Sequence, residues 1–273
     1  MTYQRISATN LLRSTFGIVG SLYVPLLIIT SPNFIGNWLN VLVNQDLDSA
    51  INGWKISGVV TWNNLIYYLN LIYWLCAVPL LWGATIFYTY QSLTENQVTV
   101  GESFKHAYRI LPQLMLAWIP IGLMFYIYLS PLGVLQRLMF ASISNASPLV
   151  FAGLIALIIP GLYLGIRLQF SLFATTIDNA AAQDSISSSW KLTKERWWLL
   201  FRANLLIGIV TAVPLQLIPL LINNFLGFLL FNSPLVVIFQ LLVIVLQLSL
   251  EVLTSVYFVL LYRRLRDSVA TIQ

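Results

Sequence analysis

The chain has 273 residues, of which 59% are hydrophobic and only 8% are charged, and its formal net charge is +5. Soluble domains carry about 25% charged residues, so this composition excludes an ordinary soluble protein. Five charge-free stretches exceed the roughly 20 residues that a helix needs to cross a bilayer, namely Ser14–Gln45, Ile56–Thr94, Ile110–Gln136, Leu138–Ile166 and Ala203–Leu250. We therefore expect an all-α integral membrane protein that forms one polytopic domain over residues 1–273.

Six transmembrane helices are predicted on the apolar stretches, at about 11–30, 62–90, 110–130, 149–177, 199–222 and 234–262. Eleven of the 14 Lys and Arg residues fall on one side of these spans, and only Lys55 and Arg137 fall on the other. Because basic loops stay in the cytoplasm, we expect a multi-pass protein of the cytoplasmic (inner) cell membrane with both termini cytoplasmic. Arg5 and Arg13 precede the first span without a cleavage signal, which predicts an uncleaved helix.

A weak internal repeat links the predicted cytoplasmic joints. A serine precedes a base by six residues in Ser7–Arg13, Ser103–Arg109 and Ser185–Lys191, and the same register aligns Gly83 with Gly165. Self-similarity of this kind indicates repeated structural units. The predicted architecture is three helical hairpins, each preceded by a cytoplasmic interfacial amphipathic helix, with possible repeats over residues 1–95, 96–180 and 181–273.

The third joint, residues 182–202, is the most strongly marked of the three. Asp184 or Ser185 is expected to cap a surface helix, because a side-chain oxygen satisfies free backbone N–H groups and a carboxylate suits the helix dipole. Its apolar stripe is predicted to lie in the lipid headgroup region, and consists of Ile186, Trp190, Thr193 and Trp197.

The basic residues of the same joint fall beside this stripe, where they can reach lipid phosphates. Lys and Arg near a membrane surface attract anionic headgroups. The predicted partners are therefore the lipid bilayer, its anionic headgroups and a possible membrane-protein partner, and no nucleic acid. The residues expected to make these contacts are Trp190, Lys191, Lys194, Arg196, Trp197 and Arg202.

Two ionisable residues fall inside predicted spans, where a charge is costly and indicates function by default. Arg167 lies eleven residues before Asp178, and Glu251 lies twelve residues before Arg263. At 1.5 Å per residue, both are expected about 17 Å from the cytoplasmic helix ends. We predict that the two face each other or share a polar cavity. Two interpretations stay open: a buried ion pair that fixes helix registry, and a transport or substrate site.

A polar face accompanies Glu251 on the sixth span. Gln247, Glu251 and Thr254 lie within about 40° of Gln240 around the helix, so the four are expected to face protein or water. Hydrogen bonding between helices explains such a face, and a transport pathway is the alternative. The predicted intramembrane polar site comprises Arg167, Glu251, Gln247 and Gln240.

Motifs for catalysis are absent from the sequence. It contains no HExxH, GxSxG, phosphate-binding glycine loop or nucleotide fingerprint. The single histidine, His106, is expected to be a solvated residue on the second joint, and Asp46 and Asp48 a solvated part of a loop. We therefore expect no catalytic residue, no metal and no cofactor, and a protein that is not an enzyme.

One segment carries a family resemblance. A proline–glycine and an arginine in one span, an acidic joint and a S-W-x-L-T-x-x-x-W-W run resemble the bacterial glycerophosphoryl diester phosphodiesterase membrane domain and related membrane families of unknown function. The ending Val256–Asp267 is similar too. The resemblance implies a membrane module of undefined activity, because the catalytic domain of the named members is absent here. The matching residues are Pro160, Gly161, Arg167, Asp178, Ser189, Trp190, Leu192, Thr193, Trp197 and Trp198.

Two functional hypotheses follow from these patterns. The first is a non-enzymatic membrane module that organises lipids or a partner at the cytoplasmic face, because the joints are basic and rich in tryptophan. The second is a transporter or permease-like carrier that uses the polar site around Arg167 and Glu251.

Overall fold

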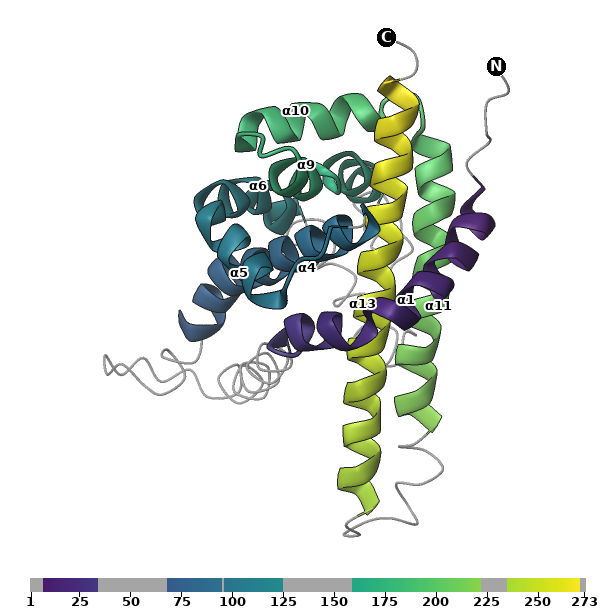
Figure 1. Cartoon of the computed structure of the whole chain (residues 1–273). Helices are drawn as coiled ribbons and strands as arrows, with labels where there is room; N and C mark the ends of the chain where they lie inside the picture. The colour runs from purple at the N-terminus through teal and green to yellow at the C-terminus, as the bar shows by residue number, and fades with distance from the viewer. Residues whose placement is uncertain (1–6, 34–67, 95, 125–158, 222–234, 271–273) are drawn as a thin grey trace, which may run out of the picture.

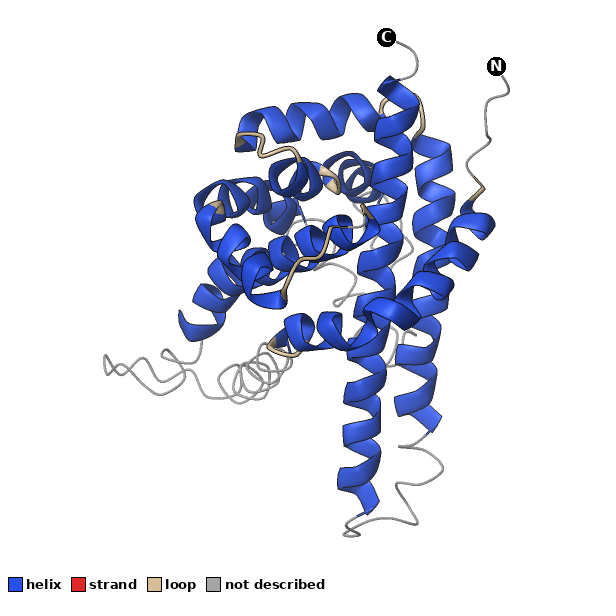
Figure 2. Ribbon diagram, viewed as in Figure 1, coloured by secondary structure: helices blue, strands red, loops and turns tan. Residues whose placement is uncertain are grey.

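The predicted all-helical class is confirmed. The computed structural model describes residues 7–33, 68–94, 96–124, 159–221 and 235–270, and every regular element in these ranges is a helix (Figure 2). Of the sequence features named above, Arg5, Lys55, Arg137 and the Asp46–Asp48 pair lie outside the described residues.

Four helices in the described ranges are long and apolar enough to cross a membrane. They are α1 (Ala8–Thr30), the continuous helix Tyr68–Leu93, α11 (Trp197–Leu221) and α13 (Leu235–Ala270). Helix Tyr68–Leu93 contains the π-helical segment η1 (Tyr73–Ala77) and continues as α4 (Val78–Leu93). The protein is therefore a helical membrane protein.

Shorter helices fill the middle of the chain. Helices α5 (Val100–Arg109) and α6 (Leu111–Met124) meet at a bend of 76°, and the pair is apolar enough to be counted as a fifth, broken span. A helix over residues 159–168 is followed by α9 (Ser171–Ile177) and α10 (Ala182–Thr193). Four or five membrane-length helices are thus found in the described residues, where six spans were predicted from the whole sequence.

Helix α13 is the axis of the molecule (Figure 1). Helix α11 runs beside its length, α1 packs across it at an angle, and α4, α5, α6, α9 and α10 gather on one side. The start of α1, the end of α13 and the whole of α10 lie toward the same end of the molecule. We call this the α10 end.

The aromatic core lies near the α10 end, where α13 meets α9. Tyr262 is fully buried, and its ring centroid lies 5.8 Å from that of Phe170 and 5.6 Å from that of Phe173. One turn and a half earlier on α13, the buried Tyr257 donates a hydrogen bond to the carbonyl of Ala203 on α11. Aromatic pairs at these distances stabilise a core by more than their buried area alone.

Two glycines allow neighbouring helices to pack closely against α6. A Cβ atom on Gly83 of α4 would lie 2.6 Å from Cδ1 of Leu114, and one on Gly165 would lie 3.3 Å from the sulfur of Met124. Both neighbours belong to α6, so α6 packs between α4 and the helix over residues 159–168. The sequence register that aligned Gly83 with Gly165 thus identified two packing positions of similar kind.

The predicted fourth span is not a continuous helix. Its described part breaks at Gln169 and Phe170, between residues 159–168 and α9. Proline does not cause this break, because Pro160 lies nine residues before it. The break is stabilised instead by a side chain from α10, described below.

The first predicted joint is also not a separate surface helix. Ser7–Arg13 leads directly into α1, which runs without interruption from Ala8 to Thr30. The second and third joints do form separate helices, α5 and α10. Residues 8–13 form the first turns of the same helix as the span, so this joint has no helix of its own.

The two joint helices begin differently. In α5, Thr99 and Glu102 form a capping box, in which the Thr99 side chain accepts from the Glu102 N–H and Glu102 accepts from the Thr99 N–H. These hydrogen bonds hold the pKa of the Glu102 carboxyl below its ordinary value. Helix α10 begins at Ala182 without a side-chain cap, so the predicted capping by Asp184 or Ser185 is wrong; Asp184 lies in the first turn.

Candidate functional site

Ser189 of α10 fills the break in the preceding helix. Its hydroxyl donates to the carbonyl of Arg167 at 2.6 Å and accepts from the N–H of Phe170 at 3.2 Å. These are backbone groups that a continuous helix would pair internally. Buried backbone groups without partners are costly, so the fully buried Ser189 both stabilises the break and attaches α10 to it.

Arg167, at the end of the helix before the break, caps the C-terminus of α10. Its guanidinium donates to the carbonyl of Trp190 at 3.2 Å, to the carbonyl of Lys194 at 3.4 Å and to the hydroxyl of Thr193 at 3.4 Å. The last carbonyls of a helix lack partners within the helix, and a cation there also suits the helix dipole. Arg167 is only 6% exposed, so these contacts satisfy a buried charge.

Aromatic rings enclose the same guanidinium. The central carbon of Arg167 lies 5.1 Å from the ring centroid of Tyr163 and 5.0 Å from that of Trp190. The Tyr163 hydroxyl also accepts from Arg167 at 2.9 Å. Cation–π contacts of this kind strengthen when the cation is shielded from water.

The tryptophan pair of the third joint continues this aromatic cluster. The Trp197 ring lies 6.1 Å from Tyr163 and stacks on Phe201 at 5.2 Å. Five of the ten residues that carry the family resemblance therefore meet in one structural unit: Arg167, Ser189, Trp190, Thr193 and Trp197. We call this unit the α10 clamp, and it comprises Tyr163, Arg167, Ser189, Trp190, Thr193 and Trp197.

The predicted pairing of Arg167 with Glu251 is wrong. Within the described residues, the hydrogen-bond partners of Arg167 are residues of the α10 clamp and Lys194, the C-cap residue of α10, whereas the partners of Glu251 come from other elements. The residue count had placed both at one depth. The break after residue 168 and the return of α10 instead bring Arg167 to the surface joint.

Glu251 lies near the middle of α13 in a second polar cluster. Its Oε2 accepts a hydrogen bond from the side-chain amide of Asn33 at 2.9 Å, and the side chain of Gln247 also hydrogen-bonds to it. The hydroxyl of Tyr73 donates to Oδ1 of Asn33 at 2.9 Å. We call Asn33, Tyr73, Gln247 and Glu251 the α13 acid cluster.

The π-helical segment η1 positions Tyr73 in this cluster. Pro79 follows η1 and has no N–H to give to the carbonyl four residues earlier. Its ring would also clash with that carbonyl, and a local change to π-helical bonding relieves such strain. Gln247, predicted from the polar face, is confirmed as a neighbour of Glu251, whereas the Gln240 side chain lies outside the described residues.

The outer surface of the third joint presents bases, as predicted. Lys191, Lys194 and Arg202 are exposed, and Trp198 is 66% exposed beside them. The buried face of α10 consists of Ser185, Ser189 and Thr193. The predicted surface stripe was therefore wrong at Thr193, because small hydroxyl residues allow α10 to pack closely against the broken helix.

Two residues predicted for the headgroup surface are held by protein contacts. Arg196 donates to the carbonyl of Leu265 at 3.2 Å and to the hydroxyl of Ser268 at 2.5 Å, both on α13. Trp197 is half-buried among aromatic rings. Arg196 thus joins the third joint to the end of α13, and this leaves Lys191, Lys194 and Arg202 as its exposed bases.

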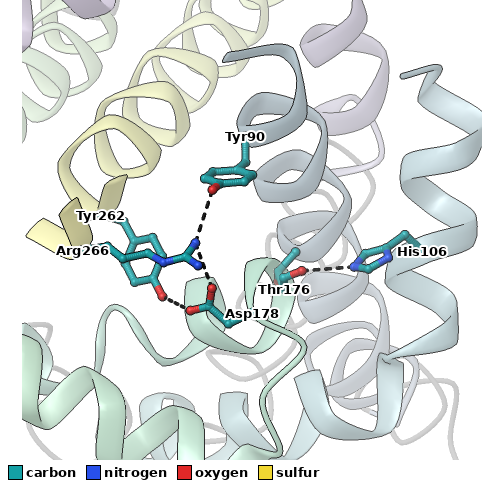
Figure 3. A network of polar contacts seen from close by, with 6 residues as sticks. All are labelled: Tyr90, His106, Thr176, Asp178, Tyr262 and Arg266. Atoms are coloured by element: carbon teal, nitrogen blue, oxygen red, sulfur yellow. Dashed lines mark hydrogen bonds and ion pairs between the residues drawn. The ribbon is translucent and has the colours of Figure 1, made fainter. Parts of the chain in front are cut away.

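A third polar network lies where α4, α9 and α13 end together (Figure 3). The two oxygens of Asp178 accept from the Tyr262 hydroxyl at 2.6 Å and from Arg266 at 3.0 Å. Arg266 also donates to the Tyr90 hydroxyl at 3.3 Å. Sequence reasoning used Asp178 as the end of a span and as part of the family resemblance but did not connect it to α13, because no local pattern links residues 84 or more positions apart.

His106 is not the solvated residue that was predicted. Its imidazole stacks on Phe87 of α4 at 3.9 Å, and its Nε2 lies 3.1 Å from the carbonyl of Thr176 on α9 (Figure 3). A carbonyl only accepts, so Nε2 is the donor. Helix α5 folds back against α4 and carries His106 inward. Within the described residues, no group of three or more His, Cys, Asp or Glu side chains could hold a metal ion.

Comparison with known proteins identifies the family. Residues 69–265 match the family described as domain of unknown function (DUF7847), and this range contains the α10 clamp and the end of α13. No curated protein and no solved structure matches the chain. Because the family match covers most of the 273 residues, the chain belongs to the DUF7847 family.

Proposed function

We propose that this protein is a non-enzymatic, multi-pass membrane module that binds anionic lipid headgroups through α10 and the first turns of α11. One observation carries the proposal. Lys191, Lys194 and Arg202 are exposed beside the exposed Trp198, while the opposite face of α10 is fixed to the body of the protein. Such a fixed surface offers its charges to a ligand at little cost in conformational freedom.

The chemistry of these side chains suits phosphate groups at a membrane surface. Ammonium and guanidinium groups form short, charge-assisted hydrogen bonds to phosphate oxygens, and an indole ring favours the interface between acyl chains and water. The cluster stands at the start of α11, a helix apolar enough to span the membrane. The bases would therefore lie at headgroup depth. A membrane-protein partner with an acidic surface could meet the same side chains.

We propose a topology of six spans in three hairpins, located in the cytoplasmic (inner) cell membrane. Both termini lie in the cytoplasm. The positions of the start of α1, the end of α13 and α10 toward one end support it (Figure 1). Eleven of the 14 Lys and Arg residues are predicted to lie on the same side of the membrane as this end, and loops rich in Lys and Arg stay in the cytoplasm. Relationship to the glycerophosphoryl diester phosphodiesterase membrane domain stays a prediction, and no activity is carried over from it.

A lipid-dependent stability measurement tests the proposal. The detergent-solubilised protein is heated with phosphatidylglycerol or with phosphatidylcholine, and the rise in unfolding temperature is compared. We expect phosphatidylglycerol to stabilise the wild type more, and the triple variant K191Q/K194Q/R202Q to lose most of this preference. Each base near an anionic surface contributes on the order of 1 kcal/mol.

The matched control is the triple variant R13Q/K105Q/R109Q, which neutralises three exposed bases at the other two joints. It should keep most of the preference for phosphatidylglycerol. An equal loss in both triple variants would mean that only net charge matters and would contradict a site at the third joint.

A further inference from the structure

Glu251 is an acid in apolar surroundings, and no base in the described part of the chain pairs with it. It lies inside the membrane-length part of α13, Leu242–Val269, and its neighbours Val252 and Leu253 are buried. The residues from Leu235 to Tyr262 include no other charge. Removing a carboxylate from water costs several kcal/mol unless a partner or a proton compensates the charge.

Among the described residues, the carboxyl group of Glu251 hydrogen-bonds to neutral side chains. Asn33, three residues after the end of α1, and Gln247, one turn earlier on α13, hydrogen-bond to Glu251, and Tyr73 donates to Asn33. No Lys, Arg or His in the described residues forms a hydrogen bond or an ion pair with it. The arrangement therefore stabilises a carboxyl group by hydrogen bonds but does not supply a positive charge.

The other described ionisable groups on the helices packed against α13 are either tyrosines, which supply no positive charge, or charged residues that lie away from Glu251. On α1, Tyr23 hydrogen-bonds to Ser249, and Arg13 lies near the N-terminus of the helix, whereas Asn33 follows its C-terminus. On the helix with η1 and α4, Tyr73 belongs to the cluster, whereas Tyr90 contacts Arg266. The charges of α10 and α11 lie at the α10 end: Asp184, Lys191 and Arg202. Along α13 itself, Arg263 is twelve residues away, or about 18 Å.

The directions of the hydrogen bonds favour a proton over a metal ion as the ligand. Asn33 turns its amide N–H toward Glu251 and its oxygen toward Tyr73, so the carboxyl group faces a donor. A hard cation would need several oxygens directed at it. A proton needs only one acceptor. If Glu251 gains a proton, its O–H can donate to a rotated Asn33 amide, and the Asn33 N–H can then donate to the Tyr73 oxygen.

From this geometry we propose that Glu251 is a proton-binding site inside the membrane, with Asn33 and Tyr73 as a hydrogen-bonded relay that reverses when the proton binds. The step is proton association alone: one O–H bond forms at a carboxylate oxygen, and the proton comes from water. The site does not depend on the lipid-binding proposal, because it shares no residue with the third joint. A carrier would require an ionisable site inside the membrane, and Glu251 would supply that site without Arg167.

Labelling with dicyclohexylcarbodiimide tests the site. A protonated carboxyl group in a membrane adds across one C=N bond of this apolar carbodiimide: a carboxyl oxygen bonds to the central carbon, and the carboxyl O–H proton moves to the nitrogen of that C=N bond. The full-length protein in liposomes is labelled over a range of pH, digested, and analysed by mass spectrometry. We expect an adduct on Glu251 that increases as the pH falls, and no adduct on the exposed Glu102 of α5.

Two relay variants sharpen the test. At a pH well above the labelling midpoint of the wild type, where the rate follows the small protonated fraction, Asn33→Ala should label faster by about threefold to tenfold, because the charged carboxylate loses a hydrogen bond of roughly 1 kcal/mol. Tyr73→Phe should shift labelling in the same direction by less. The matched control Tyr23→Phe removes a phenol that bonds to Ser249 instead, and it should label like the wild type.

Two outcomes would overturn the proposal. One is a wild-type protein in which Glu251 is never labelled at any pH while the reagent modifies another carboxyl group. The other is an adduct whose yield does not change with pH. Because these readings come from the wild-type chain, a variant that fails to fold leaves the test intact.

Discussion

The α10 clamp and the α13 acid cluster show two ways to keep an ionisable residue inside an apolar protein. Arg167 is surrounded by groups that stabilise a cation, namely helix-terminal carbonyls and the faces of two aromatic rings. Glu251 is surrounded by amides and a phenol that can serve either its charged or its neutral form. The first arrangement fixes a charge in place, and the second allows the charge to change.

This difference separates a structural residue from a candidate site. A guanidinium does not lose its proton in proteins, and Arg167 has its terminal nitrogens committed to α10 and Tyr163. A carboxyl group with neutral neighbours can take up a proton without breaking a salt bridge. The comparison predicts unequal responses to neutral substitutions in the two clusters.

Loss of the Arg167 side chain should have the largest effect on stability. Arg167→Ala leaves the last carbonyls of α10 and two aromatic rings without their cation, and we expect a loss of about 2–4 kcal/mol in unfolding free energy. Arg167→Lys should recover only part of it, because one ammonium cannot reach the same acceptors. Denaturant unfolding in micelles measures both. A loss below about 1 kcal/mol for the alanine variant would show that the clamp is not structural.

Ser189→Ala should weaken the clamp from its other side. The substitution leaves the carbonyl of Arg167 and the N–H of Phe170 unpaired at the helix break, which should cost about 1–3 kcal/mol. The matched control is Ser187→Ala, on the exposed face of the same helix. Equal unfolding free energies for the two variants would contradict the role of Ser189.

The network around Asp178 offers an intermediate case. Tyr262→Phe deletes only the hydroxyl that donates to Asp178 at 2.6 Å and should destabilise the protein by about 1 kcal/mol. Tyr108→Phe, on a side chain that is 72% exposed, serves as the control and should be neutral. Thermal unfolding that ranks the two variants in the reverse order would show that this network contributes nothing measurable.

Glu251→Gln should have the smallest effect on stability of the four substitutions. Glutamine keeps the shape and an acceptor for Asn33 but removes the titratable group, so we expect a change within about 1 kcal/mol in either direction. The same variant should abolish labelling at this position. A large loss of stability would instead indicate that the carboxylate is paired with a positive charge.

The sequence predicted the helices well but not the meeting of distant residues. Long apolar stretches identify α1, α11 and α13, because the length of an apolar stretch determines whether it can cross a bilayer as a helix. The depth of Arg167 was counted along a straight helix. That count failed because the chain breaks at Gln169 and Phe170, and the compensating hydroxyl of Ser189 lies 19 or more residues further on.

The partners of Glu251 were beyond local patterns for a related reason. Asn33 is 218 positions away, and Tyr73 reaches it through a π-helical segment next to Pro79. Gln247 was found because it lies one helical turn from Glu251, at a spacing that sequence periodicity detects. His106 was misjudged because only the packing of α5 against α4 shows that it faces inward.

A double-mutant cycle tests the separation of the two charged residues most directly. The unfolding free energies of the wild type, Arg167→Gln, Glu251→Gln and the double variant are measured under one set of conditions. Because the two residues share no partner, their effects should add to within about 0.5 kcal/mol. A coupling energy above about 1 kcal/mol would show that Arg167 and Glu251 form one site, and it would contradict the division into a structural clamp and a proton-binding acid.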